Sequence, residues 1–100
     1  MREDRQRLDK WLWFARFAKT RTSAAKLVSD GFVRVNSERN ENPGKGVAVG
    51  DVLTIAARHV TAVVRVEALG ERRGPAPEAR RLYADLGRDD AALVTPQDDR

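Results

Sequence analysis

The segment from Arg7 to Lys26, RLDKWLWFARFAKTRTSAAK, constrains the fold most, because it combines a helical apolar pattern with a run of basic residues. Its apolar residues recur with the i, i+3, i+4 and i+7 spacing of a helix that packs one face on a core, namely Leu8, Trp11, Leu12, Ala15 and Ala18. Lys10, Trp13 and Phe17 fall on the opposite side. We therefore predict a core helix that begins near Arg5 or Arg7, with Trp13 and Phe17 packed on a strand or a later helix rather than free to stack on bases.

A second helix follows almost at once. Thr20 is a suitable N-cap because its hydroxyl can accept a hydrogen bond from a backbone N–H of the next turn. The helix is predicted from about Arg21 to Asp30, and Gly31 suits the left-handed position just past its end. Its apolar face consists of Ala24, Ala25, Leu27 and Val28. The two helices should form an angled hairpin, and we call the bend between them, residues 16–21, the elbow.

The rest of the chain predicts short strands and one more helix. Strands are expected at Phe32–Asn36, around Val47 and Val49, at Val52–Ile55 and at Val60–Leu69, with a polar loop at 37–46 and turns at 42–44 and 50–51. Short strands joined by turns favour an antiparallel sheet. A short C-terminal helix is predicted from Pro77 to Gly87, with Leu82, Tyr83 and Leu86 as its apolar stripe. Residues 1–87 are expected to form one domain, and residues 88–100 a flexible acidic tail.

Composition argues against an enzyme. A domain of 100 residues buries roughly 60 to 70% of its unfolded surface, which leaves little room for an enclosed active site. There is no cysteine and His59 is the one histidine, so we expect no metal, cofactor or catalytic residue. No apolar run approaches the ~20 residues that span a bilayer, so we expect a cytoplasmic protein without a membrane partner.

The charge is concentrated in the first part of the chain. Residues 1–60 carry 12 basic and 7 acidic residues, a net of +5, whereas residues 61–100 carry 7 and 8, a net of −1. The segment from Lys10 to Lys26, both included, has five basic residues and no acidic one. Such a surface favours a polyanion, because neutralising phosphates releases counterions, although a solvated face would have the same composition. We expect Arg16, Lys19 and Arg21 to carry binding, since the local sequence offers them no acidic partner.

Several motifs resemble a known family. The stretch RLDKWLWFARFAKTRTSAAKLVSDGFVRVN and the later GDVLTI resemble the S-four RNA-binding domain, which is named after a small-subunit ribosomal protein. RLDKWLW, the KTR tripeptide at residues 19–21 and RRGPAPEARRLY are similar to the fifteen-kilodalton heat-shock protein family. The resemblance covers residues 5–87. It implies an α+β fold in which a two-helix hairpin packs on a small twisted antiparallel sheet, with non-catalytic RNA binding by the helix pair and the adjoining strand loop.

The resemblance also implies partners and site residues. Its members associate with ribosomal RNA on free large ribosomal subunits that carry peptidyl-tRNA, in rescue or quality control, and the name suggests stress response, with DNA binding as a related property. Transferred by position, the expected RNA-binding residues are Arg7, Lys10, Arg16, Lys19, Thr20, Arg21, Lys26, Arg34, Asn36, Arg39 and Lys45. The chain has Asn36-Ser37 where the family usually has Asn-Gly, Asn42 where a lysine or arginine is common, and an acidic tail instead of a basic one.

Two other functions fit the same residues. The domain could direct a separate RNA-modifying enzyme to its substrate, since S-four domains occur in such enzymes and this sequence has no catalytic part. Alternatively, Trp13 and Phe17 could bind another protein, with the charge incidental. We expect the protein to be a monomer when it is free in solution.

Overall fold

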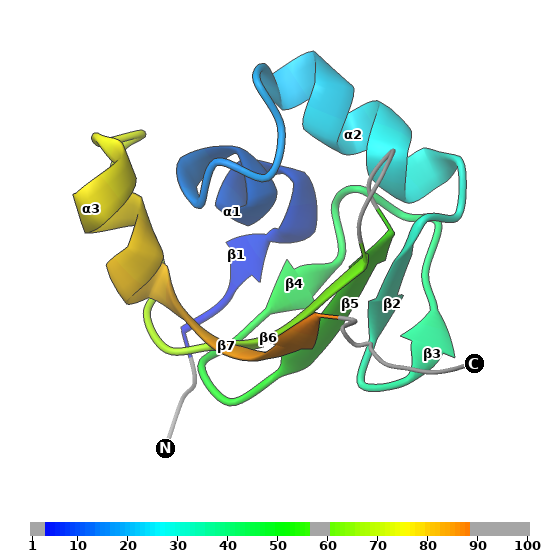
Figure 1. The fold of residues 1–100 in the computed structure, drawn as a ribbon. Coiled ribbons are helices and arrows are strands. Elements are labelled where there is room, and N and C mark those ends of the chain that lie inside the picture. Colours follow the sequence, from blue (N-terminus) through cyan, green and yellow to red (C-terminus); the bar gives the residue numbers. More distant parts are fainter. Residues whose placement is uncertain (1–3, 57–60, 89–100) are drawn as a thin grey trace.

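The computed structural model describes residues 4–56 and 61–88, which form an α+β domain with helices packed on one side of an antiparallel sheet (Figure 1). The five-stranded sheet has the order β3-β2-β5-β6-β7, and β1 and β4 form a small separate pair. Its strands are β2 (Val33–Val35), β3 (Glu38–Arg39), β5 (Val52–Ala56), β6 (Thr61–Val66) and β7 (Tyr83–Arg88), with β1 (Gln6–Arg7) and β4 (Gly46–Val47) in the pair. The helices are α1 (Leu8–Phe14), α2 (Arg21–Ser29) and α3 (Ala76–Ala79). The predicted fold class is confirmed.

The core lies between the helix pair and one face of the sheet. Val33 pairs with Ile55 and Leu53 with Val64 across neighbouring strands, so alternate residues present one apolar surface. The helices cover it with fully buried side chains, namely Leu8, Trp11, Leu12, Ala24 and Val28. The predicted apolar stripes of both helices are therefore confirmed as core, apart from Ala18, Ala25 and Leu27, which are only partly buried.

Helix α1 ends earlier than its apolar period predicts. The N–H of Phe17 donates to the carbonyl of Leu12 (2.9 Å) and that of Arg16 to the carbonyl of Trp13 (3.1 Å), which is the Schellman pattern of a helix end. Arg16 has a φ of 67°, a left-handed position that glycine usually occupies. The chain therefore turns back, and the ring of Phe17 stacks 6.1 Å from that of Trp11. Phe17 thus packs against the core while staying partly exposed, and Trp13, also partly exposed, packs against Phe14 (5.4 Å).

Helix α2 has the predicted ends. The Thr20 hydroxyl accepts a hydrogen bond from the N–H of Ser23 (2.9 Å) and caps the helix. Gly31 follows its last turn with a φ of 87°. The short connection between α1 and α2, together with this cap, fixes the angle between the two helices. The hairpin predicted from the sequence is therefore present.

The C-terminal segment differs from its prediction. The short helix is present as α3 and a following 3₁₀ turn, Arg80–Leu82, but it stops well before Gly87. Of the predicted apolar stripe, Leu82 ends the 3₁₀ turn, whereas Tyr83 and Leu86 lie in β7. This strand pairs antiparallel with β6 from Val66↔Tyr83 to Ala62↔Arg88. Pairing with β7 satisfies backbone N–H and C=O groups at the edge of β6, and this gain outweighs the weak helical period of the segment. Strand β6 itself ends at Val66, shorter than predicted, while His59, Val60 and residues 89–100 lie outside the described residues.

The polar loop predicted at 37–46 contains strand β3, and its last residue begins β4, which includes Val47 but not Val49 of the strand predicted there. Strand β3 forms a hairpin with β2 through Asn36 and Ser37, whose φ values are 53° and 75°. Two consecutive positive φ values define the type I′ turn that matches the twist of a two-residue hairpin. Pairing of Arg34 with Arg39 in this hairpin places two basic residues side by side, which a loop prediction does not anticipate.

We predict that Ser37→Gly stabilises the protein. A left-handed conformation costs an L-residue about 1 kcal/mol, and glycine avoids most of that cost, so the free energy of unfolding should rise by about 0.5–1 kcal/mol in urea denaturation. Ser29→Gly is the matched control, because Ser29 lies in the last turn of α2 and the same change there should lower stability by a few tenths of a kcal/mol. Equal effects at both positions would contradict the prediction.

Candidate nucleic-acid interface

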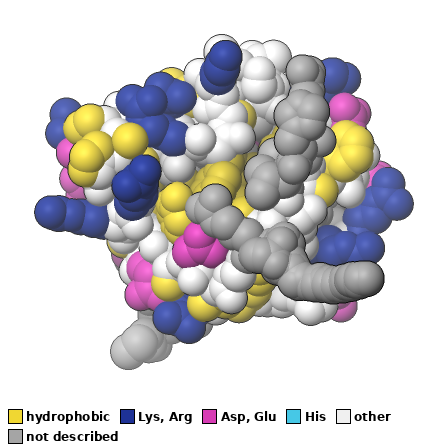
Figure 2. Space-filling model, viewed as in Figure 1, with side chains coloured by type: hydrophobic (Ala, Val, Ile, Leu, Met, Phe, Trp, Pro, Cys, Tyr) yellow, Lys and Arg dark blue, Asp and Glu magenta, His cyan; other side chains and the backbone are white. Residues whose placement is uncertain are grey.

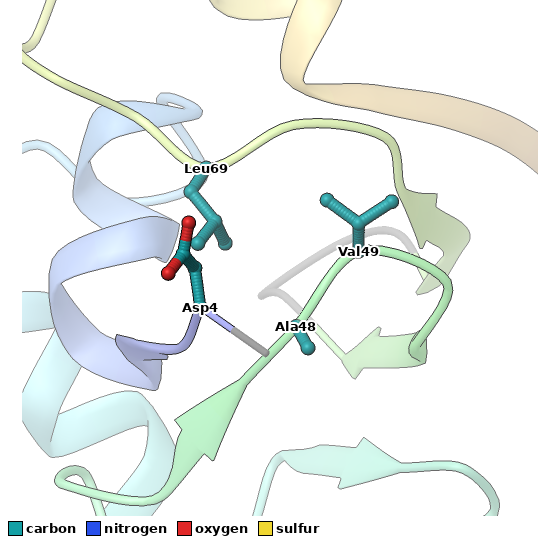
Figure 3. Close-up of a pocket in the computed structure, with 4 residues that line it drawn as sticks. All are labelled: Asp4, Ala48, Val49 and Leu69. Carbon is teal, nitrogen blue, oxygen red and sulfur yellow. The ribbon is translucent and has the colours of Figure 1, made fainter. Parts of the chain in front are cut away.

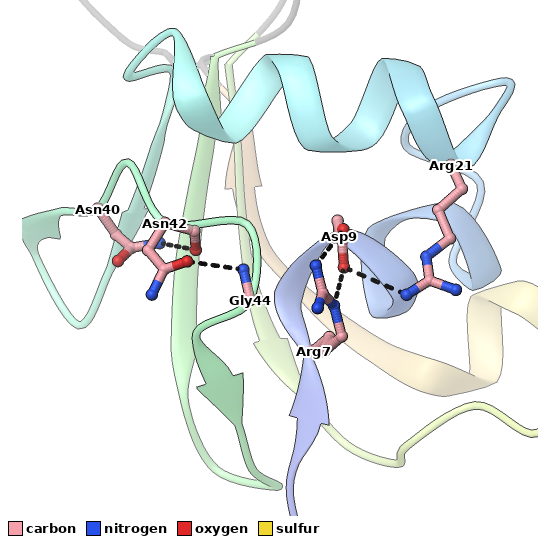
Figure 4. A network of polar contacts seen from close by, with 6 residues as sticks. All are labelled: Arg7, Asp9, Arg21, Asn40, Asn42 and Gly44. Carbon is pink, nitrogen blue, oxygen red and sulfur yellow. Dashed lines mark hydrogen bonds and ion pairs between the residues drawn. The ribbon is translucent and has the colours of Figure 1, made fainter.

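Two of the predicted site residues meet around a buried carboxylate at the start of the helix pair. Asp9 is 3% exposed, and its carboxylate accepts hydrogen bonds from Nε and Nη2 of Arg7, both 3.1 Å long (Figure 4). Nη2 of Arg21 lies 3.9 Å from the same carboxylate. We call Arg7, Asp9 and Arg21 the helix-start cluster. The side chains of its two arginines are about half exposed, so they present positive charge while the carboxylate behind them stays covered.

The carboxylate fixes both charge and orientation. The hydrogen bond to Asp9 and the negative charge of Asp9 raise the pKa of Arg7 above the ordinary value of an arginine. The two parallel hydrogen bonds also hold the planar group in one position. A cation held in place loses less side-chain entropy when it meets a phosphate, so the cluster is preorganised for an anion.

The loop that carries Lys45 is joined to this cluster through the first turn of α1. The backbone N–H groups of Leu8 and Asp9 donate to the carbonyls of Lys45 (2.8 Å) and Pro43 (3.0 Å). These bonds satisfy groups that a helix start leaves without intrahelical partners. Asn42 shapes the loop, since its side chain accepts from the N–H of Gly44 (3.0 Å). The exposed Lys45 is therefore anchored beside the helix-start cluster.

The elbow presents three further candidates with different environments. Nε of Arg16 donates to the carbonyl of Gly74 (2.7 Å), so this exposed residue has a distant partner that local sequence did not predict. Lys19 is exposed and makes no hydrogen bond or ion pair with the residues described. The hydroxyl of Thr20 is engaged in capping α2. Lys19 is thus the least restrained of the elbow cations.

A segment far along the chain holds the elbow in place. Arg73 donates to the carbonyls of Trp13 (3.2 Å) and Ala18 (3.4 Å), on either side of the turn at Arg16. The side chain of Gln6 exchanges two hydrogen bonds with the backbone of Gly70 (2.9 and 3.0 Å). We call residues 68–74 the brace. Sequence reasoning missed it, because nothing in the RRGP motif itself indicates that Arg73 reaches the carbonyls of Trp13 and Ala18.

The other candidates lie at the far end of α2 or are otherwise engaged. Lys26 pairs with Asp30 (3.2 Å) and Arg39 with Glu41 (2.9 Å), so acidic neighbours offset their charge. Arg34 stands opposite Arg39 in the hairpin, and the guanidinium of Arg39 lies beside Gly31, just past the end of α2. We call Lys26, Arg34 and Arg39 the far-end group. The amide of Asn36 is occupied by Asp51 and Val52, and Lys10 lies over the ring of Phe14 (5.6 Å).

Within 4–56 and 61–88 there is no group of three or more His, Asp or Glu side chains able to hold a metal ion. A hollow of about 370 Å³ is lined by Asp4, Ala48, Val49 and Leu69, whose side chains Figure 3 shows around it. Among the described residues that line it, the charged one is Asp4, and a carboxylate disfavours a phosphate. None of the described helices has the length and apolar character to cross a membrane.

Basic side chains also gather at the other side of the elbow. Figure 2 shows Lys and Arg side chains over α3 and the elbow, beside hydrophobic ones. Together with the helix-start cluster, they give the domain a positive surface centred on a rigid helix pair. A helix pair packed on a small antiparallel sheet places the protein in the class of S4-type domains. The S4 domain family matches residues 6–53.

The similarity extends beyond that domain. The chain is 39% identical over 106 residues to heat shock protein 15 of Escherichia coli (strain K12), covering 94% of this chain and 79% of that protein. The chain therefore belongs to the heat shock protein 15 family. The heat shock protein 15 homolog of Haemophilus influenzae is 40% identical over 85 residues, or 85% of this chain and 64% of that protein.

A solved structure and a ribosomal protein extend the comparison. The structure of Vibrio cholerae heat shock protein 15, described as trimeric, superposes with a TM-score of 0.78 at 40% identity and 83% coverage of each chain. The small ribosomal subunit protein uS4 of Xanthobacter autotrophicus is 40% identical over 72 residues, covering 70% of this chain and 35% of that protein. These relationships support an RNA-binding, ribosome-associated role, and the predicted family is confirmed.

Proposed function

We propose that this protein binds ribosomal RNA on the free large ribosomal subunit while that subunit still carries peptidyl-tRNA, and acts without catalysis in the cytoplasm. The observation that carries this proposal is the helix-start cluster, where a buried Asp9 holds two half-exposed arginines in fixed positions. Membership in the heat shock protein 15 family supports the ribosome as the source of the RNA.

The proposed interface combines affinity with register. The helix-start cluster, Lys19 and the anchored Lys45 supply the positive charge for phosphates. The capped helix pair and the brace keep these groups at constant separations, so only an RNA surface with matching phosphates can meet all of them. Structured ribosomal RNA offers such surfaces, whereas a flexible single strand must be ordered on binding.

Sedimentation tests this proposal. Purified protein is mixed with separated small subunits, empty large subunits, large subunits carrying peptidyl-tRNA, and whole ribosomes, and each mixture is centrifuged through a gradient. We expect the protein to travel with large subunits, most strongly with those carrying peptidyl-tRNA, and duplex DNA added as competitor should displace little of it. Movement with small subunits alone would contradict the proposal. Recovery from extract with an RNA-modifying enzyme instead of any subunit would favour the targeting function.

A further inference from the structure

A second feature lies on the other side of the elbow. A hollow of about 200 Å³ opens between the elbow and α3, lined by Ala15, Arg16, Phe17, Ala76, Ala79, Arg80 and Tyr83. More than half of these residues lie outside residues 6–53, the range that matches the S4 domain. The hollow is therefore a property of this chain's own C-terminal segment joined to the elbow.

The wall of the hollow contains two aromatic rings. The centroids of Phe17 and Tyr83 lie 4.9 Å apart with the planes tilted by 49°, and both residues are half-buried. Small residues, Ala76 and Ala79 among them, leave space beside the rings. The hydroxyl of Tyr83 makes no hydrogen bond to any residue that the structure describes, although a partly buried tyrosine hydroxyl ordinarily has a partner. This wall suits a flat aromatic ligand with a polar edge.

Two arginines supply positive charge at the same hollow. Arg16 is held by the hydrogen bond from its Nε to the carbonyl of Gly74 and by its left-handed backbone. Its terminal nitrogens have no partner among the described residues. Arg80 forms no hydrogen bond or ion pair within 4–56 and 61–88. The nearest acid on α3, Glu78, is engaged by Arg72 through two bonds (2.7 and 3.1 Å). The two arginines are therefore available for an anion.

We propose that this hollow binds one unpaired nucleotide of the RNA, with its base against Phe17 and Tyr83 and its phosphate between Arg16 and Arg80. The inference rests on the proposed RNA-binding function and adds a second contact to it. The volume is below the ~300–1,000 Å³ of pockets for small molecules, so it accommodates a single base rather than a larger ligand. Unpaired bases that stack on aromatic side chains and arginine planes are a common basis of RNA recognition.

The test compares two RNA hairpins with the same stem, one fully paired and one with a single bulged 2-aminopurine. The protein should bind the bulged hairpin about five- to tenfold more tightly at equal salt, and the fluorescence of 2-aminopurine should fall on binding. Arg80→Ala removes one cation, and Ala76→Leu fills the hollow without changing charge. Both variants should bind the paired hairpin and lose the preference. Arg81→Ala removes the same charge at the exposed neighbouring position and should keep the preference.

The outcomes separate this inference from the proposed function. Equal binding of both hairpins by the parent protein, with no change in fluorescence, would overturn the nucleotide site and leave RNA binding intact. A preference that survives in both Arg80→Ala and Ala76→Leu would place the bulged base elsewhere and would also overturn it. If the parent protein bound neither hairpin and no ribosomal subunit, both proposals would be contradicted.

Discussion

A variant that lacks the elbow cations is expected to bind structured ribosomal RNA on the order of 100-fold more weakly, at about 1 kcal/mol for each charge removed. The variant combines Arg16→Gly, Lys19→Ala and Arg21→Ala. Glycine is chosen at position 16 because the backbone there has a φ of 67°. The slope of log affinity against log salt should fall by up to about three, one for each phosphate that the protein no longer neutralises. Binding titrations at several salt concentrations measure both quantities.

The far-end group provides the charge-matched control. Replacing Lys26, Arg34 and Arg39 with alanine also removes three positive charges, but acidic partners already offset two of them. We expect a loss of only a few-fold in affinity. Arg65→Ala gives a single-residue control for Arg21→Ala, because the two arginine side chains are 48% and 45% exposed and each pairs with a carboxylate. Equal losses in both triple variants would show that net charge alone drives binding and that the elbow has no special role.

The helix pair could be predicted from the sequence because its signals are local. A helical apolar period, a threonine N-cap and a glycine after the last turn each act within a few residues, and the structure confirms all three. Reliance on local signals also explains why the predicted first helix is too long. An arginine at the left-handed position carries none of the usual glycine signal, so the apolar period alone extends the predicted helix to Ala18.

Elements that depend on distant pairing were harder to predict. Leu82, Tyr83 and Leu86 fit a helical stripe, yet pairing with β6 draws the last two into a strand. Asp9 was missed as an organiser, because its importance depends on burial and on Arg21, twelve residues away, lying within 3.9 Å of it. Likewise, the carbonyls that Arg16 and Arg73 reach are 55 to 60 residues distant. Charge predicts which residues are candidates, but only the fold determines which of them are held in place.

The second large effect concerns stability, and it follows from the position of Trp11. This side chain is fully buried, its indole N–H donates to the carbonyl of Ala68 (2.9 Å), and its ring contacts those of Phe17 (6.1 Å) and Tyr83 (6.4 Å). It therefore joins the helix pair to the brace and to β7. Trp11→Ala should lower the free energy of unfolding by about 3–5 kcal/mol, a large share of the ~5–15 kcal/mol typical of a small domain.

Urea denaturation of three variants tests this role. Trp11→Phe keeps a ring but leaves the Ala68 carbonyl without its donor, so we expect a loss of about 1–3 kcal/mol, measurable even where Trp11→Ala is unfolded. Trp13→Ala is the matched control, because Trp13 is only half-buried and its indole makes no hydrogen bond to a described residue. It should cost about 1–2 kcal/mol. A Trp13→Ala loss as large as that of Trp11→Ala would contradict a special contribution of Trp11, and of its hydrogen bond to Ala68, to stability.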